Sequence, residues 1–589
     1  MALIDKASLL MVPSTYEAGK LYNVLPSGNR APDNKGGAGY DQTRADFDFD
    51  RGSNAAATRI NSSGLIEKYR ANELLNSNGF NDAVWTKKFS SVTSNQIGYD
   101  GSNDAWLIEK SAASGRVQQI QSGTGVSTFS VYAKAGTLNY MRLRAFSSSN
   151  PSCFFDFTDG SIHNNDGISA TMTSVGGGWY RCSYSFVSSL IEVQIYPADS
   201  TSSVAGTTGS IYIQSAQQES GLVATDVLTS GATTAKAGVL VDLPRINYDA
   251  NGENGALLLE PSRKQLIQFS EYFGASYWTK TGSSVVSGFT SPEGLSNAYK
   301  LVEDTSTGNH RLFTIATTTS AGYLSIYAKA GERTEVNIAG AVNEAYFNLS
   351  TGVVISETTA GIAKIDSLSN GWYRCSIKTT ILTSNSINIY TSVGGSNSYT
   401  GDGTSGVYIF GAMLEQNATY PSSYIPNHGE SGGVTRAADS CSVTGASDVI
   451  GQTEGTMYVE AKVTFSSRNG RIMLIGENND FIELVGLSNG KVESFAYNGS
   501  VQAQIYSSST YSSGDNLKIA LAYKANDFVV YINGVQEGAD TSGVIPSSMA
   551  RIILNNYFAA GYNEANEYKQ ATLFNERLSN AELATLTTL

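Results

Sequence analysis

The chain has 589 residues, a formal net charge of −13, and only 15% charged residues. This length predicts about three to five domains, each large enough for its own hydrophobic core. The sparse charge leaves Ser, Thr, Asn and Gly to cover the solvated faces, and the acidic balance argues against nucleic acid or an anionic membrane as partner.

Residues 1–72 differ from the rest, being rich in Gly, Asp, Asn and Arg with few alternating apolar runs. The short run 9–12 lacks the pattern of a signal peptide, and no run approaches the ~18 residues of a membrane span. We expect no membrane insertion, and any role outside a cell would need a route other than secretion. Because 1–72 buries little by itself, it is interpreted as an attachment arm, with a loose tail as the alternative. The expected attachment residues are Phe49, Arg51, Arg59 and Ile60.

Residues 73–222 predict an antiparallel sandwich, because short period-two runs alternate with Gly/Ser/Asn clusters. After a linker at 223–263, residues 264–433 repeat this module at offsets of 193 to 195 residues. The matching pairs are Trp85 and Trp278, Tyr132 and Tyr327, and Trp179 and Trp372. A repeat this long is a whole domain, and tandem modules suit binding because linked weak sites gain avidity.

Residues that recur at matching positions of the two copies are expected to pack in the interior. Cys182 and Cys375 follow a Tyr in alternating strands and are expected in the cores as small hydrophobes. Trp179 and Trp372 are expected to pack inside the protein, in preference to forming sugar-stacking platforms; the other repeated Trp pair fits the core or the module edge. The cysteine spacing suggests neither zinc nor dependence on disulfides, and we expect no cofactor and no metal.

Residues 434–589 no longer match the repeat. Runs 457–463, 517–523 and 528–532 alternate as strands, and a tight Asn-Gly turn follows the last. The segment 578–586 predicts a short helix, with Ser579 as the N-cap and Glu582 three residues later.

No catalytic constellation can be assembled from the sequence. Residues 401–406 match GxGxxG, but a strand follows and no helix opens, so a turn is expected. The three histidines, His163, His310 and His428, stand in unrelated contexts, and no Ser/His/Asp set emerges. A glycosidase string of the form Glu-x-Asp-x-Glu is also missing. We predict a protein without enzymatic activity.

Loop tips of a rigid sandwich are where a lectin-type site is expected. In residues 434–589, several polar tips carry Asn, Asp and Tyr, each of which could also be an ordinary turn residue. The carbohydrate-binding candidates are Asn479, Asp480, Tyr497, Asn498, Asn556, Tyr557 and Tyr562.

Several stretches resemble known families. Residues 530–535 (VYINGV) and 571–583 (ATLFNERLSNAEL) resemble concanavalin A-like, laminin-G-type jelly rolls. The repeats, through 130–136, 178–182 and 414–426, resemble the carbohydrate-binding-module-like jelly rolls of tailed-bacteriophage virion proteins. Residues 49–67 resemble the N-terminal region of the same proteins.

The resemblance implies an all-β, multidomain protein of tandem antiparallel jelly-roll sandwiches with an extended N-terminal arm. It implies a structural component of the virion, assembled in the host cytoplasm: a tail fibre, spike or other appendage that binds host-surface polysaccharide. The arm would bind other virion proteins, and a homo-oligomer, specifically a trimer, is expected. Two alternatives stay open: a capsid-attached head fibre or decoration protein with a structural role, and a glycan depolymerase.

Overall fold

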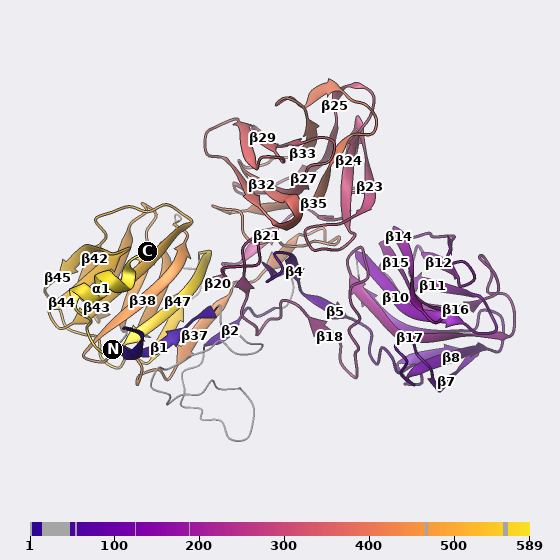
Figure 1. Ribbon diagram of the computed structural model, residues 1–589, viewed down its shortest axis with the longest axis horizontal. Coiled ribbons are helices and arrows are strands. Elements are labelled where there is room, and N and C mark those ends of the chain that lie inside the picture. The colour runs from indigo at the N-terminus through magenta and orange to yellow at the C-terminus, as the bar shows by residue number, and fades with distance from the viewer. Residues whose placement is uncertain are drawn as a thin grey trace.

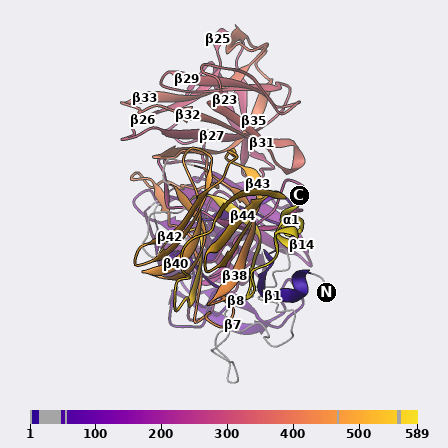
Figure 2. The same cartoon turned by 90° about the vertical axis from the view of Figure 1, so that its left-hand side faces the viewer.

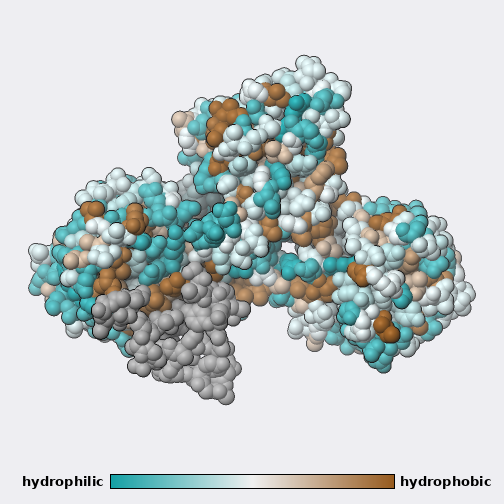
Figure 3. Space-filling view, viewed as in Figure 1, coloured by the Kyte–Doolittle hydropathy of each residue, from teal (hydrophilic) through white to brown (hydrophobic). Residues whose placement is uncertain are grey.

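The computed structural model describes residues 3–13, 47–53, 56–123, 125–187, 189–465, 469–557 and 564–589. Within these ranges the chain is nearly all β-structure in antiparallel pairs, with one α-helix, α1 (Asn580–Thr587), and 3-10 turns at Leu3–Lys6 and Ser369–Gly371. Three sandwiches surround a junction of short strands (Figure 1). The visible surface is mainly hydrophilic or neutral, with hydrophobic residues in small separate patches (Figure 3). The all-β, multidomain prediction is confirmed.

Module 1, at residues 73–222, is a sandwich of two six-stranded sheets. Across the first sheet the strands are β14 (Ser169–Gly176), β15 (Trp179–Val187), β10 (Val126–Ala135), β17 (Gly209–Ser220), β8 (Ala105–Lys110) and β7 (Ser90–Gln96). Across the second they are β13 (Ile162–His163), β12 (Ser152–Asp156), β11 (Tyr140–Phe146), β16 (Leu190–Ala198), β9 (Arg116–Gly123) and β6 (Trp85–Lys88). One face of each sheet packs into a shared core.

Module 2, at residues 264–433, has the same strand order in both sheets. The first contains β31 (Ala363–Ser367), β32 (Trp372–Thr379), β27 (Gly322–Lys329), β35 (Gly406–Gln416), β24 (Ala298–Glu303) and β23 (Ser283–Phe289), with β21 (Arg263–Gln265) and β36 (Val434–Arg436) at one side. The second contains β30 (Val353–Glu357), β29 (Asn343–Asn348), β28 (Glu335–Gly340), β33 (Asn385–Ser392), β26 (Arg311–Ala316) and β22 (Thr279–Thr281). A small sheet pairs β25 (Thr307–Asn309) with β34 (Ser398–Thr400).

The two modules also share their irregularities. The register slips between Ser130 and Tyr132 where β10 meets β17, and between Ser325 and Tyr327 where β27 meets β35. A bulge at the same place in both copies re-aims the tyrosine that follows it. The sequence repeat is therefore a repeat of topology and register.

The repeated Trp and Cys residues are buried, as predicted. Trp85 and Trp278 are 0% and 2% exposed, and each indole Nε1 donates a 2.9 Å hydrogen bond to a backbone carbonyl nine residues earlier. Cys182 and Cys375 lie in the inter-sheet cores, where burial raises the pKa of both thiols. The third Trp pair is also buried, but in smaller clusters on the outer face of the first sheet.

The C-terminal sandwich draws its strands from three parts of the chain. One sheet runs β19 (Ile246–Asn247), β20 (Ala256–Leu259), β47 (Asn566–Phe574), β38 (Glu454–Val463), β43 (Asp515–Lys524), β44 (Asp527–Ile532) and β45 (Val535–Asp540), with β1 (Ala7–Met11) on β47. The other runs β2 (Asp48–Asp50), β37 (Ser440–Thr444), β46 (Arg551–Leu554), β39 (Gly470–Glu477), β40 (Asp480–Gly486), β41 (Val492–Asn498) and β42 (Val501–Tyr506).

Part of the expected arm and part of the expected linker are integrated into these sheets. Strand β1 pairs with β47 and β2 with β37, because Leu9, Met11 and Phe49 are core residues of the C-terminal sandwich. The chain ends marked N and C accordingly lie on the same sandwich in Figures 1 and 2. The remaining strands of the two segments lie between the sandwiches: β3 (Thr58–Ile60) with β4 (Ile66–Lys68), and β5 (Arg70–Asn72) with β18 (Ala235–Ala237). Residues 14–46 lie outside the described residues.

Two local predictions are also confirmed. Helix α1 is capped by Ser579, whose side chain accepts from the Glu582 backbone while the Glu582 carboxylate accepts from Ser579 N at 2.8 Å. The GxGxxG match forms an irregular segment that leads into β35, with no helix after it. No helix in the described part of the chain is long and apolar enough to cross a membrane.

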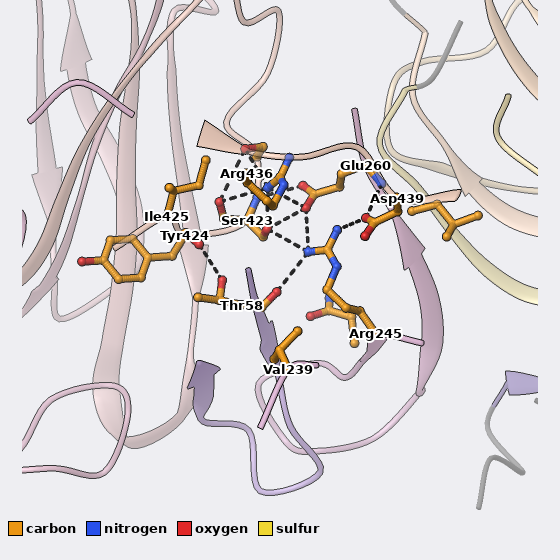
Figure 4. A network of polar contacts seen from close by, with 12 residues as sticks. Thr58, Val239, Arg245, Glu260, Ser423, Tyr424, Ile425, Arg436 and Asp439 are labelled. Carbon is orange, nitrogen blue, oxygen red and sulfur yellow. Dashed lines mark hydrogen bonds and ion pairs between the residues drawn. The ribbon is translucent and has the colours of Figure 1, made fainter. Parts of the chain in front are cut away.

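A buried network of charges ties the junction together (Figure 4). Arg245 Nη1 donates to Thr58 O at 3.0 Å and to Glu260 Oε2 at 2.9 Å, and its Nη2 donates to Asp439. Arg436 Nη1 lies 2.8 Å from the same Glu260 oxygen. The ion-paired side chains are at most 2% exposed. The network thus joins β3, the segment between the modules, and the start of the C-terminal sandwich.

The oppositely charged groups of this network keep one another ionised. Burial on its own would raise the pKa of Glu260, but Arg436 and Arg245 outweigh it and hold the pKa at about 2. Ser423, in the segment of module 2 that follows β35, adds hydrogen bonds to this carboxylate through its N at 2.8 Å and its Oγ at 2.6 Å. The carboxylate stays ionised, and the junction is fixed by directional bonds.

Candidate functional site

An aromatic cluster lies on the outer face of the seven-stranded sheet of the C-terminal sandwich. Strands alternate their side chains between two faces, so residues that flank the core set point outward. On this face Leu474, Phe481 and Ile553 are buried, and they pack against three partly buried rings. Those rings belong to Phe495, Tyr497 and Tyr557. We call these six residues the aromatic face.

Strand register sets the geometry of the rings. Phe481 on β40 stands opposite Tyr497 on β41, and their rings stack with centroids 5.5 Å apart. Tyr557 meets Phe481 edge-on at 5.7 Å, and Phe495 stacks against Tyr497 at 6.1 Å. Offset-stacked and edge-to-face pairs are the favourable arrangements of aromatic side chains. The face is therefore a packed and oriented platform.

A cation and a carboxylate border the platform. The Arg471 guanidinium lies 5.0 Å from the Tyr557 ring, and its Nε donates to Glu483 Oε2 at 3.1 Å. Burial raises the pKa of Glu483, and Arg471 opposes that shift. On the far side the face continues onto β42, where Gln504 donates to Glu493 at 2.5 Å and to Tyr506 Oη at 2.6 Å.

The predicted carbohydrate-binding residues divide between two places. Tyr497 and Tyr557 belong to the aromatic face. Asp480 and Asn498 pair across β40 and β41 with the opposite alternation, so they lie on the other side of the sheet end. Asn479 is exposed in the turn between β39 and β40, and its carbonyl accepts from Gly499 N at 2.9 Å.

Asn556 precedes Tyr557, and its Oδ1 accepts from Tyr557 N at 2.8 Å, so it shapes the backbone beside the aromatic face. Tyr562 lies outside the described residues. Sequence reasoning missed Phe481, Phe495 and Arg471, although Phe495 and Tyr497 are two apart on one strand, a spacing that signals a shared face.

The expected attachment residues contact the chain itself. Phe49 is 7% exposed in the C-terminal core, and Arg51 pairs with Asp439 in the junction at 3.5 Å. Arg59 Nε donates to Glu67 at 2.7 Å across the β3–β4 hairpin, and Ile60 packs partly buried against module 2. Their role in attachment stays a prediction.

The aromatic face has the means for non-covalent recognition. Rings offer flat apolar area, while Gln, Glu and Arg offer directional hydrogen bonds, a combination typical of ligand sites. Among the described residues, no group of three or more His, Cys, Asp or Glu side chains could hold a metal ion.

Comparison with known proteins reveals similarity in solved structures alone. No family model and no curated protein sequence matches the chain. Similar structures include the CBM40 of the Ruminococcus gnavus IT-sialidase bound to α2,3-sialyllactose (16% identity, TM-score 0.23, 25% of this chain and 88% of that one). A heptameric SAP-like pentraxin from Limulus polyphemus has 13% identity, TM-score 0.20, and coverage of 23% and 70%. Domain 4 of AbnA, an arabinanase of Geobacillus stearothermophilus in complex with arabinotriose, has 14% identity, TM-score 0.23, and coverage of 27% and 79%.

Proposed function

We propose that the protein binds glycans without cleaving them, and that it does so as an appendage of a tailed-phage virion, a tail fibre or spike. The observation that carries the binding role is the aromatic face, in which Phe481, Tyr497 and Tyr557 form an oriented platform bordered by Arg471 and Gln504. The virion role is supported by the sequence resemblance of the repeats and of residues 49–67.

Binding at such a face is shallow. A ring stacks on the apolar side of a sugar, and neighbouring amides and carboxylates bond its hydroxyls. Each site is weak, and several copies on one particle raise the avidity without new contacts. The buried junction suits this role, because it holds the sandwiches in one geometry for simultaneous contact.

The binding role is tested by Tyr497→Ala in the full chain, on an array of bacterial surface polysaccharides. Truncating a central aromatic is expected to weaken binding at least about tenfold. Phe89→Ala is the matched control, since Phe89 is 54% exposed on module 1, and it is expected to bind like wild type. Equal binding by all three proteins would refute the role of this face. Release of reducing ends from a bound polysaccharide would favour the depolymerase alternative.

The virion role is tested by a reconstruction of the particle that contains this chain. Density for the three sandwiches at the tail is the expected result, and density on the capsid shell would favour the head-fibre or decoration alternative. Light scattering of the purified protein tests the trimer that the resemblance implies, and a monomer at micromolar concentration would contradict it.

A further inference from the structure

A row of cations and aromatic rings crosses the outer face of the second sheet of module 1. One residue comes from each strand, and neighbours in the row are partners in register or in ring contact. In order across β6, β9, β16, β11, β12 and β13, the row consists of Lys88, Arg116, Tyr196, Arg142, Phe154 and His163. The intervening residues of these strands fill the core, so this set faces outward. We call it the cationic row.

The rings of the row hold the guanidinium groups in place. Arg116 and Arg142 lie 5.3 and 5.5 Å from the Tyr196 ring, and Arg142 also lies 5.4 Å from the Phe154 ring. Tyr196 and Phe154 are only 2% and 6% exposed, whereas both arginines are partly exposed. The rings therefore lie beneath the cations and orient them by cation–π stacking. Sugar stacking on these rings is blocked, and the surface they present is charged.

Arg142 and Arg144 keep much of their donor capacity, whereas Arg116 donates from Nε to Gln118 Oε1 at 2.6 Å and from Nη1 to Ser114 O at 3.3 Å. Within the described part of the chain, Arg142 donates from Nη2 to Ser152 Oγ at 3.1 Å, and Arg144 donates from Nη2 to Asn150 Oδ1 at 2.8 Å. Arg144 also stacks at 5.1 Å on Phe146. The Nε atoms of Arg142 and Arg144 are buried, so the Nη groups are the donors that a ligand can reach. Oriented guanidinium groups with free Nη–H donors match a carboxylate or sulfate.

An amide accompanies the cations. Gln118 is partly exposed and donates to Glu192 at 2.7 Å. Gln194, which stands opposite both Arg144 and Gln118, is 1% exposed, and its amide donates to Glu192 and accepts from the Tyr196 hydroxyl. Amides bond sugar hydroxyls, so the row offers a saccharide both cations for its acidic groups and an amide for its hydroxyls. Six strands at about 4.8 Å spacing make the row roughly 24 Å long, room for an extended oligomer.

Module 2 carries the same face with most of its charge removed. Strand order and register place Thr281 where module 1 has Lys88, Asn337 for Arg142, and Ala339 for Arg144. Arg311 is retained on β26 and lies 5.9 Å from the ring of Tyr390 on β33. The two copies thus share a stacked arginine and differ by three cations, which is a difference in surface charge and not in fold.

We propose that the cationic row of module 1 is a binding site for an anionic saccharide, one that bears carboxylate or sulfate groups, and that the matching face of module 2 does not select for charge. Arg116, Arg142 and Arg144 pair with the acidic groups, and the partly exposed Gln118 bonds hydroxyls. This site is separate from the aromatic face, and the proposal does not depend on the function proposed for that face.

The test measures binding of the full chain to an oligogalacturonate, to a sulfated chondroitin oligosaccharide, and to the carboxyl-reduced galacturonate oligomer by calorimetry. Wild type is expected to bind at least one acidic probe about 10–100-fold more tightly than the reduced oligomer, with affinity falling as NaCl rises. Arg142→Asn and Lys88→Thr, which install the residues of module 2, are each expected to weaken acidic binding. Lys88 is exposed, so the second variant tests the site without risk to the fold.

Controls separate this site from general charge and from the aromatic face. Lys364→Ala removes a lysine whose side chain is 58% exposed on module 2 and is expected to leave affinity unchanged. Tyr497→Ala is also expected to retain acidic binding, whatever it does to other glycans. The proposal is overturned if neither acidic probe binds, if Arg142→Asn and Lys88→Thr bind like wild type, or if a single-stranded oligonucleotide binds more tightly than both probes.

Discussion

Replacing Asp439 with alanine removes a carboxylate that lies between two buried guanidinium groups. Its Oδ1 is 3.5 Å from Arg51 Nη1, and its Oδ2 accepts from Arg245 Nη2 and from Glu260 N at 2.9 Å. The side chains of Asp439, Arg51 and Arg245 are all 0% exposed. Because a buried charge that loses its partner retains the full cost of leaving water, breaking such a pair costs about 3–5 kcal/mol.

We expect the lower end of this range, because Glu260 still faces Arg245 at 2.9 Å after the change. For a cooperative unit of 150–250 residues, each kcal/mol shifts Tm by about 2–4 °C, so a loss of about 3 kcal/mol lowers Tm by about 6–12 °C. Differential scanning calorimetry measures this shift. Limited proteolysis should in addition cut the chain near Arg51 and Arg245 earlier than in wild type, since both segments are held by this carboxylate.

Asp366→Ala is the matched control. It breaks the exposed ion pair with Lys364, in which the N–O distance is 2.8 Å. The side chains of Lys364 and Asp366 are 58% and 41% exposed, so the change should lower the free energy of unfolding by less than about 1 kcal/mol. If Asp439→Ala melts within a degree of Asp366→Ala and resists proteolysis equally, the junction is not held by its buried charges, and the reasoning is refuted.

Two further changes test other parts of the fold. Leu9→Ala should destabilise the C-terminal sandwich by about 2–5 kcal/mol, because Leu9 is 1% exposed in its core; Leu10→Ala, on the partly exposed face of the same strand, should cost less, and a chemical-denaturation series compares them. Burial raises the pKa of Glu293 to about 7, with Lys68 opposing, against an ordinary 4.5. The neutral carboxyl thus favours the folded state below pH 4.5, and this contribution is lost as pH rises through 7. Glu293→Gln should flatten the fall in stability between pH 5 and pH 8, and an unchanged slope would contradict this.

Much of the fold could be predicted from local patterns in the sequence. Period-two alternation identified strands such as β38 and β43, and the spacing of Trp85 and Trp278 indicated two copies of one module. The N-cap Ser579 located α1. These features depend on residues close together in the chain, or on comparison of the chain with itself, so a single sequence contains them.

Pairing between distant segments could not be read in the same way. Leu9 and Met11 stand out as a short apolar run, but nothing local indicates that β1 joins β47. Arg245 and Glu260 look like ordinary surface charges until the junction closes around them. The same limit explains why only part of the candidate site was predicted. Tyr497 was predicted because it precedes a polar turn in the sequence. Its partner Phe481 becomes relevant only once the register of β40 and β41 is known.

The position of β1 has a consequence for biosynthesis. Ala7 pairs with Phe574, so the strand leaves the ribosome about 560 residues before its partner, a wait of about 30–110 s at ordinary elongation rates. Throughout that interval the two modules can fold, whereas Leu9 and Met11 have no sheet to enter. A nascent chain that stalls before β47 leaves the C-terminal sandwich incomplete and exposed to proteases. The C-terminal sandwich therefore forms only after all three sandwiches have been translated.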